Sequence, residues 1–149
     1  MLDQLRSDKF VGPDSIEIEP GSGELVMRGE IGCKGGILID VEKTLAIISG
    51  WGDEALVETV RYKYNVSLRG LSNILRYDNQ DEDFSFRKNH ADRHHKHVFD
   101  WRTGIQQRVE WVGADNWPKL NQVIEEMREW YGEHMHELKA QGYPALGLR

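Results

Sequence analysis

Nine residues in the middle of the chain, NHADRHHKH (89–97), hold four of its six histidines. Neutral imidazole binds transition metals, and its ordinary pKa of about 6.5 also lets it accept or donate a proton near neutral pH. Arg93 and Lys96 lie in the same stretch and are suited to binding phosphate. The stretch therefore allows a metal site, an acid–base site, a phosphate-binding site or a solvated loop.

A metal site needs ligands on one face of an element. On a strand, alternate residues share a face, so His95 and His97 would point together and His94 away. On a helix, the pairs would be His90 with His94 and His94 with His97. A third ligand would come from an acidic residue elsewhere, such as Asp78, Asp92 or Asp100. The spacing matches no standard zinc motif, and the basic residues of the stretch would repel a cation. We therefore predict no metal and no cofactor.

Acid–base chemistry on phosphate fits the mixture of histidine and basic residues better. Cleavage of RNA by its own 2′-OH group needs a base, an acid and cations that stabilise the charged phosphorane. We expect His95 or His97 to act as the base and its neighbour as the acid. Lys96 and Arg76 would stabilise the phosphate, and Asp78 would orient an imidazole. The predicted catalytic set is His94, His95, Lys96, His97, Arg76 and Asp78.

An aromatic and basic segment, RYKY (61–64), is a candidate substrate contact. On a strand, Tyr62 and Tyr64 share one face, and tyrosines on an exposed sheet can stack on bases. The alternative is that both rings belong to the core between sheet and helix. We expect substrate to be held by Tyr62, Tyr64, Arg87, Lys88 and Arg93.

Composition limits the class of protein. The chain has 149 residues and a net charge of −6, which argues against a general nucleic-acid binder, but residues 58–102 hold seven acidic and nine basic residues. Its one cysteine, Cys33, cannot form an internal disulfide. The polar N-terminus does not resemble a signal peptide, and no apolar run approaches the length of a membrane span. We expect a cytoplasmic protein that does not associate with membranes.

The hydrophobic pattern predicts an α+β fold. Apolar and polar residues alternate, or β-branched residues predominate, in several extended segments separated by short turns. Without helical crossovers between them, these segments predict an antiparallel meander. The predicted strands are 15–19, 24–32, 37–49, 56–68, 73–78, 97–101 and 107–113.

A long helix is predicted from near Asn116. Pro118 suits a first turn, and apolar residues recur at helical spacing from Trp117 to Leu138, so the helix should cover one face of the sheet. Gly132 weakens it without ending it. We expect a single domain over 1–149, with a loosely held tail at 140–149.

Three segments together resemble the TumE-like family, toxins of bacterial and archaeal toxin–antitoxin pairs. These are the Tyr62–Lys63–Tyr64 strand, the RYDN segment at 76–79 and HHKH at 94–97, in this order. The resemblance covers about residues 56–101. The family has a short link containing proline and histidine after the asparagine, whereas this chain has the longer, proline-free segment 80–93, in which only His90 could replace the family's histidines.

The resemblance implies a growth-inhibiting toxin that acts on RNA and has a helix-turn-helix antitoxin as partner. We therefore predict a metal-independent ribonuclease toxin. Two alternatives remain open: a non-catalytic module that binds a nucleic acid or protein, and a histidine-based metal-dependent enzyme. Formation of a homo-oligomer is also left open.

Overall fold

The computed structural model describes residues 10–50, 56–69, 71–79 and 94–141. It contains an eight-stranded sheet and one long helix, which confirms the predicted α+β class. The elements are β1 (Val11–Asp14), β2 (Glu17–Pro20), β3 (Glu24–Cys33), the 3-10 turn η1 (Lys34–Gly36), β4 (Ile37–Ser49), β5 (Leu56–Leu68), β6 (Asn73–Asp78), β7 (His95–Phe99), β8 (Gln106–Trp111) and α3 (Leu120–Ala140).

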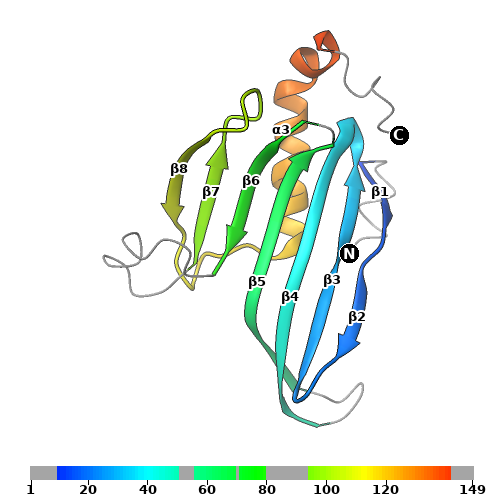
Figure 1. Ribbon diagram of the computed structural model, residues 1–149, viewed down its shortest axis with the longest axis vertical. Helices are drawn as coiled ribbons and strands as arrows, with labels where there is room; N and C mark the ends of the chain where they lie inside the picture. The colour runs from blue at the N-terminus through cyan, green and yellow to red at the C-terminus, as the bar shows by residue number, and fades with distance from the viewer. Residues whose placement is uncertain (1–9, 51–55, 70, 80–93, 142–149) are drawn as a thin grey trace.

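The strands form an antiparallel meander, as predicted. From β3 to β8 each strand pairs with the next one in the chain, and β1 and β2 both pair with β3 at one edge (Figure 1). The bounds predicted for β4, β5 and β6 agree with the structure. The pattern missed β1, a four-residue strand that contains glycine and proline and therefore has no alternation to detect.

The helix begins later than its sequence suggested. Lys119 is still extended, and its backbone N–H donates to the side-chain oxygen of Gln122 at 2.7 Å, so helical geometry starts at Leu120. It continues through Gly132 to Ala140, as predicted. The predicted loose tail lies outside the described residues from 142 onward.

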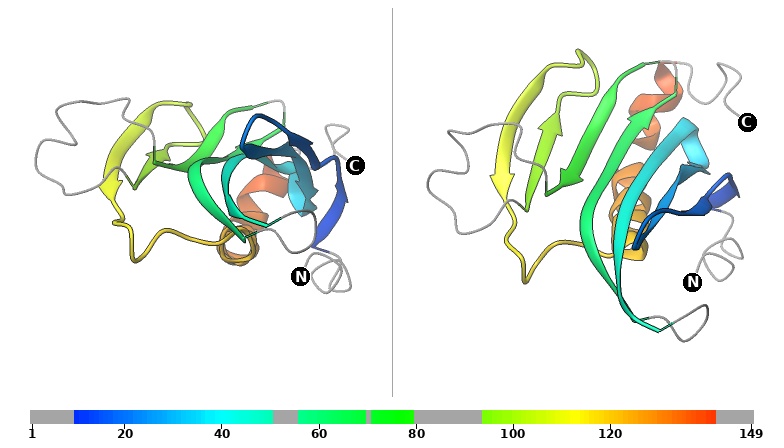
Figure 2. Two further views of the ribbon diagram at one scale, coloured as in Figure 1. Left: turned by 90° about the horizontal axis from the view of Figure 1, so that it is seen from below. Right: turned by 60° about the horizontal axis from the view of Figure 1, so that its bottom comes forward.

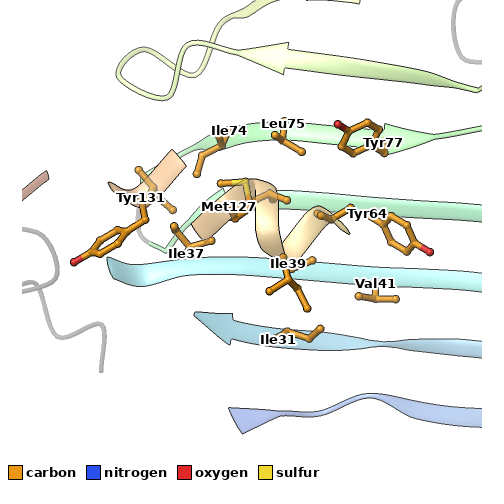
Figure 3. Close-up of a cluster of buried hydrophobic side chains, with 14 of the residues drawn as sticks. Ile31, Ile37, Ile39, Val41, Tyr64, Ile74, Leu75, Tyr77, Met127 and Tyr131 are labelled. Carbon is orange, nitrogen blue, oxygen red and sulfur yellow. The ribbon is translucent and has the colours of Figure 1, made fainter. Parts of the chain in front are cut away.

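The helix divides the sheet into two unlike faces. It packs against one of them, here called the helix face, and the opposite face is called the far face (Figure 2). Strand alternation directs Tyr62, Tyr64, Val66 and Leu68 of β5 to the helix face, where all four are buried. Figure 3 shows this core, in which Met127 of α3 lies over the strands. Its helix residues with no exposed surface are Val123, Ile124 and Met127.

Two tyrosines of this core, Tyr62 and Tyr64, differ in whether the buried hydroxyl group has a hydrogen-bond partner. The Tyr64 hydroxyl is buried without a hydrogen-bond partner, and burial raises its pKa to about 12. The Tyr62 hydroxyl hydrogen-bonds to Nδ1 of His94 at 3.1 Å. An unsatisfied buried hydroxyl costs free energy, whereas a satisfied one contributes about 1 kcal/mol.

We therefore expect Tyr64→Phe to leave the free energy of unfolding unchanged or to raise it by up to about 1 kcal/mol. Tyr62→Phe is the matched control and should lower it by about 1 kcal/mol. Urea denaturation of the two variants checks both values. Equal destabilisation by the two changes would contradict the difference in hydrogen bonding between the two hydroxyl groups.

Candidate functional site

Pairing of β6 with β7 brings part of the predicted catalytic set together. Arg76 is opposite His97, and Asp78 is opposite His95. Directly opposed residues of antiparallel strands point to the same face. All four lie on the far face, because the residues between them, Tyr77 and Lys96, point toward the helix. Arg76, Asp78, His95 and His97 are called the far-face cluster.

Asp78 is the centre of the cluster. Its side chain has no exposed surface. One carboxylate oxygen, Oδ1, lies 3.0 Å from Nε2 of His95, and the other, Oδ2, accepts from Nε of Arg76 at 3.0 Å. The carboxylate thus orients His95, as the sequence predicted, and also positions the guanidinium group.

The protonation state of His97 follows from its neighbours. A guanidinium group can only donate, so Nε2 of His97 must accept from Nη2 of Arg76 at 3.1 Å. The proton of neutral His97 is therefore on Nδ1, which donates to Oε1 of Gln106 at 2.7 Å. Burial lowers the pKa of His97, and the positive charge of Arg76 lowers it further. His97 is thus held as a neutral imidazole whose lone pair faces the cluster.

His95 has the complementary role. Its Nε2 lies 2.9 Å from Nε2 of His97 and 3.0 Å from Oδ1 of Asp78. The carboxylate oxygen can only accept, so Nε2 of His95 carries a proton. The carboxylate of Asp78 also stabilises a positive charge on this ring. The cluster therefore contains a proton donor and a proton acceptor side by side, next to the permanent charge of Arg76.

Two residues of the predicted catalytic set lie on the other face, which corrects the prediction. His94 lies beside the rings of Tyr62 and Trp117, at centroid distances of 5.6 and 5.5 Å, and these two rings stack on each other at 4.6 Å. Lys96 donates to Oε2 of Glu126 on α3 at 2.7 Å. The reason is strand alternation, which sends neighbouring residues to opposite faces. Lys96 therefore attaches the helix to the sheet, and His94 packs against Trp117 ahead of the helix, both on the face opposite the cluster.

The predicted substrate contacts are also corrected in part. Tyr62 and Tyr64 are 1% and 0% exposed beneath the helix, so neither ring offers a stacking surface. Arg87, Lys88 and Arg93 lie outside the described residues.

Asn79, the last residue of RYDN, has a structural role. Its Oδ1 accepts from the backbone N–H of Tyr62 at 3.1 Å, and its Nδ2 donates to the carbonyl of Val60 at 2.9 Å. These bonds tie the end of β6 to β5 beside a bulge in the β4–β5 pairing, so Asn79 fixes the position of the neighbouring Asp78.

Sequence reasoning missed three residues of the far face. Gln106 fixes the tautomer of His97, Lys63 is opposite Asp78 on β5, and Trp111 is opposite His95 on β8 and 45% exposed. Alternation could have found Lys63, since it lies between the two buried tyrosines. No local signal identifies Gln106 or Trp111, because their positions depend on the pairing of β7 with β8.

A polar groove adjoins the cluster on the far face. Its volume is about 610 Å³, and Arg76 is shared between the groove and the cluster. Basic, acidic and amide side chains from β3, β4, β5 and β6 line it, among them Arg28, Glu42, Lys63, Asn65 and Asn73. Space for a polar ligand therefore extends from the cluster across the sheet.

The cluster also contains a set of metal-ligand types. One ligand atom each from Asp78, His95 and His97 lies within 4.8 Å of the others. Two imidazoles and a carboxylate suit zinc and related transition metals. In the arrangement described, however, Arg76 donates to Asp78 and His97.

Comparison of the chain with protein-family models, with curated proteins and with solved structures finds no match. Within the described residues, no helix combines the length and the apolar character that a membrane crossing requires.

Proposed function

We propose that the protein is a ribonuclease that cleaves RNA at the far-face cluster, without a metal, and acts as the toxin of a toxin–antitoxin pair. The observation that carries the chemical part is the geometry around His97. Its Nε2 accepts from the guanidinium group of Arg76 at 3.1 Å and lies 2.9 Å from Nε2 of His95, which carries a proton. Base, acid and cation are the three parts that cleavage by a 2′-OH group requires.

In the proposed reaction, substrate enters between His95 and His97, and the guanidinium group of Arg76 moves from Nε2 of His97 to the phosphate. His95 starts as the imidazolium, the charged form that the carboxylate of Asp78 stabilises. Nε2 of His97 takes the proton of the 2′-OH group, and the 2′-oxygen forms a bond to phosphorus. The bond from phosphorus to the 5′-oxygen breaks, and that oxygen takes a proton from His95. The products are a 2′,3′-cyclic phosphate and a 5′-hydroxyl end. His95 then regains its proton and His97 loses its own when water opens the cyclic phosphate or when bulk solvent exchanges them.

Charge near the cluster supports binding of a phosphate. Arg76 contacts both Asp78 and His97, so its guanidinium group lies beside the proposed reacting atoms. Lys63 lies on the same face, opposite Asp78, and replaces Lys96 as the second candidate cation. The polar groove would accommodate the nucleotide next to the cleaved bond.

Trp111 is an exposed aromatic residue of the described part of the chain, and it can replace the tyrosines as a stacking surface because it is opposite His95. Stacking of a base on an aromatic ring contributes about 1–3 kcal/mol. We expect Trp111→Ala to raise the KM for an oligoribonucleotide about fivefold or more and to leave kcat within about twofold. Trp111→Phe keeps an aromatic face and should preserve KM. An unchanged KM for Trp111→Ala would exclude this contact.

The role as a toxin and the helix-turn-helix antitoxin are proposed from the motifs at 62–64, 76–79 and 94–97. The experiment is controlled expression of the wild type and of a His95→Ala/His97→Ala variant, with growth and total RNA followed over time. We expect growth arrest and RNA cleavage with the wild type alone. Equal toxicity of both proteins with intact RNA would favour the binding-module alternative.

A further inference from the structure

We propose that Asp78, His95 and His97 also form a binding site for Zn²⁺, and that Arg76 and the metal compete for the same ligand atoms. Binding at this site would make Zn²⁺ an inhibitor of the protein. The inhibitory part rests on the proposed ribonuclease function, whereas the binding part does not.

Distances between the ligand atoms support the site. Nε2 of His95 is 2.9 Å from Nε2 of His97 and 3.0 Å from Oδ1 of Asp78, and Nε2 of His97 is 3.7 Å from Oδ2 of Asp78. Zinc binds nitrogen and oxygen at about 2.0–2.2 Å, so ligands at tetrahedral or octahedral angles lie about 3.0–3.5 Å apart. The two distances from His95 are therefore close to those in a coordination shell, and the distance from His97 to Asp78 is slightly longer.

Surrounding contacts favour the same arrangement. The hydrogen bond of His97 Nδ1 to Gln106 leaves Nε2 directed at the site, as the outer partners of metal-binding histidines generally do. The side chains of the three ligands are no more than 6% exposed. Asp78 and His95 are fixed by strand pairing, so little order has to be created on binding.

Arg76 is the competitor. Its Nε and Nη2 donate to Oδ2 of Asp78 and to Nε2 of His97, and the single lone pair of Nε2 cannot serve a guanidinium and a metal together. The Arg76 side chain is 19% exposed and lines the groove, whose carboxylates Asp40 and Glu42 can receive the displaced charge. Zinc binding also requires His95 to lose the proton on Nε2.

If the metal binds, the proposed base is lost. Nε2 of His97 becomes a metal ligand and can no longer take the proton of a 2′-OH group. The same atom would thus support cleavage in the metal-free protein and prevent it when Zn²⁺ is bound.

Isothermal titration of the tag-free full chain with ZnCl₂ tests the binding part. We expect one Zn²⁺ per chain for the wild type, at least tenfold weaker binding for His97→Gln, and at least tenfold tighter binding for Arg76→Gln. His136→Ala, which changes an exposed histidine on α3, should bind like the wild type. Circular dichroism confirms that each variant is folded. Binding unaffected by His97→Gln, or not tightened by Arg76→Gln, would overturn the proposal.

The inhibitory part is tested by cleavage of a labelled RNA with increasing Zn²⁺ and with EDTA. We expect full activity in EDTA and loss of activity as the site fills. Cleavage that requires Zn²⁺ would overturn both the inhibition and the metal-free mechanism. If the protein cleaves no RNA in either condition, the ribonuclease proposal and the inhibition fail, while the titration still decides whether the metal site exists.

Discussion

His97→Gln is expected to reduce RNA cleavage by about 10²–10⁴-fold, because glutamine can hydrogen-bond but cannot take a proton. The change keeps a polar side chain beside Gln106 and Arg76, so the fold should survive. Initial rates of cleavage of a labelled oligoribonucleotide at saturating concentration measure the effect. Thermal unfolding of the same sample shows whether the protein remains folded.

His94→Gln is the matched control. His94 lies on the helix face, stacked with Trp117 and hydrogen-bonded to Tyr62. Its replacement should cost about 1 kcal/mol of stability and leave the rate of cleavage per folded molecule within about twofold. The two variants therefore compare the loss of a histidine on the far face with the loss of a histidine on the helix face. A similar loss of cleavage in both would contradict the division between the faces.

Asp78→Ala is expected to have the largest effect on stability. The carboxylate is fully buried, and its removal leaves Arg76 and His95 without their shared partner. Breaking a buried ion pair by removing one member costs about 3–5 kcal/mol. This is a large fraction of the 5–15 kcal/mol by which domains are stable. The midpoint of urea denaturation measures the loss.

Asp100→Ala provides the comparison. The Asp100 carboxylate is 26% exposed, 3.7 Å from Arg102, and accepts from its backbone N–H at 3.0 Å. Its removal should cost about 1 kcal/mol or less. An Arg76→Gln/Asp78→Ala double variant should be less destabilised than the sum of its single changes, because both changes remove the same hydrogen bond between Arg76 and Asp78. Equal costs for Asp78→Ala and Asp100→Ala would show that Asp78 is not the centre of the cluster.

Most of the fold was predictable from local patterns. Long strands such as Ile37–Ser49 and Leu56–Leu68 carry many alternating or β-branched residues, and the segments between the strands contain glycine. The helix carries an apolar stripe over 21 residues. Short elements were less accessible, and β1 has too few residues for a pattern to appear.

The site was predictable only in part. The chemistry of the proposed reaction predicted that Asp78 contacts a histidine. The alternation of a strand predicted that His95 and His97 lie on the same face. Alternation along a strand also separates His94 and Lys96 from these two histidines. What could not be predicted was the place of Arg76, because the residue opposite His97 is defined only when β6 pairs with β7. The burial of Tyr62 and Tyr64 was also not predictable, because it depends on which face of the sheet the helix covers and not on the residue type.

Alternation in β7 has a consequence for how accurately the site is held. If β7 moved by one residue along β6, every side chain would change face. In one direction Lys96 would lie opposite Arg76, with like charges adjacent, and would leave its carboxylate partner on α3. The ion pair of Lys96 with α3 and the far-face cluster therefore stabilise the same register of β7 on β6. A shift of β7 that separates the residues of the cluster would also break the ion pair of Lys96 with α3, on the opposite face of the sheet.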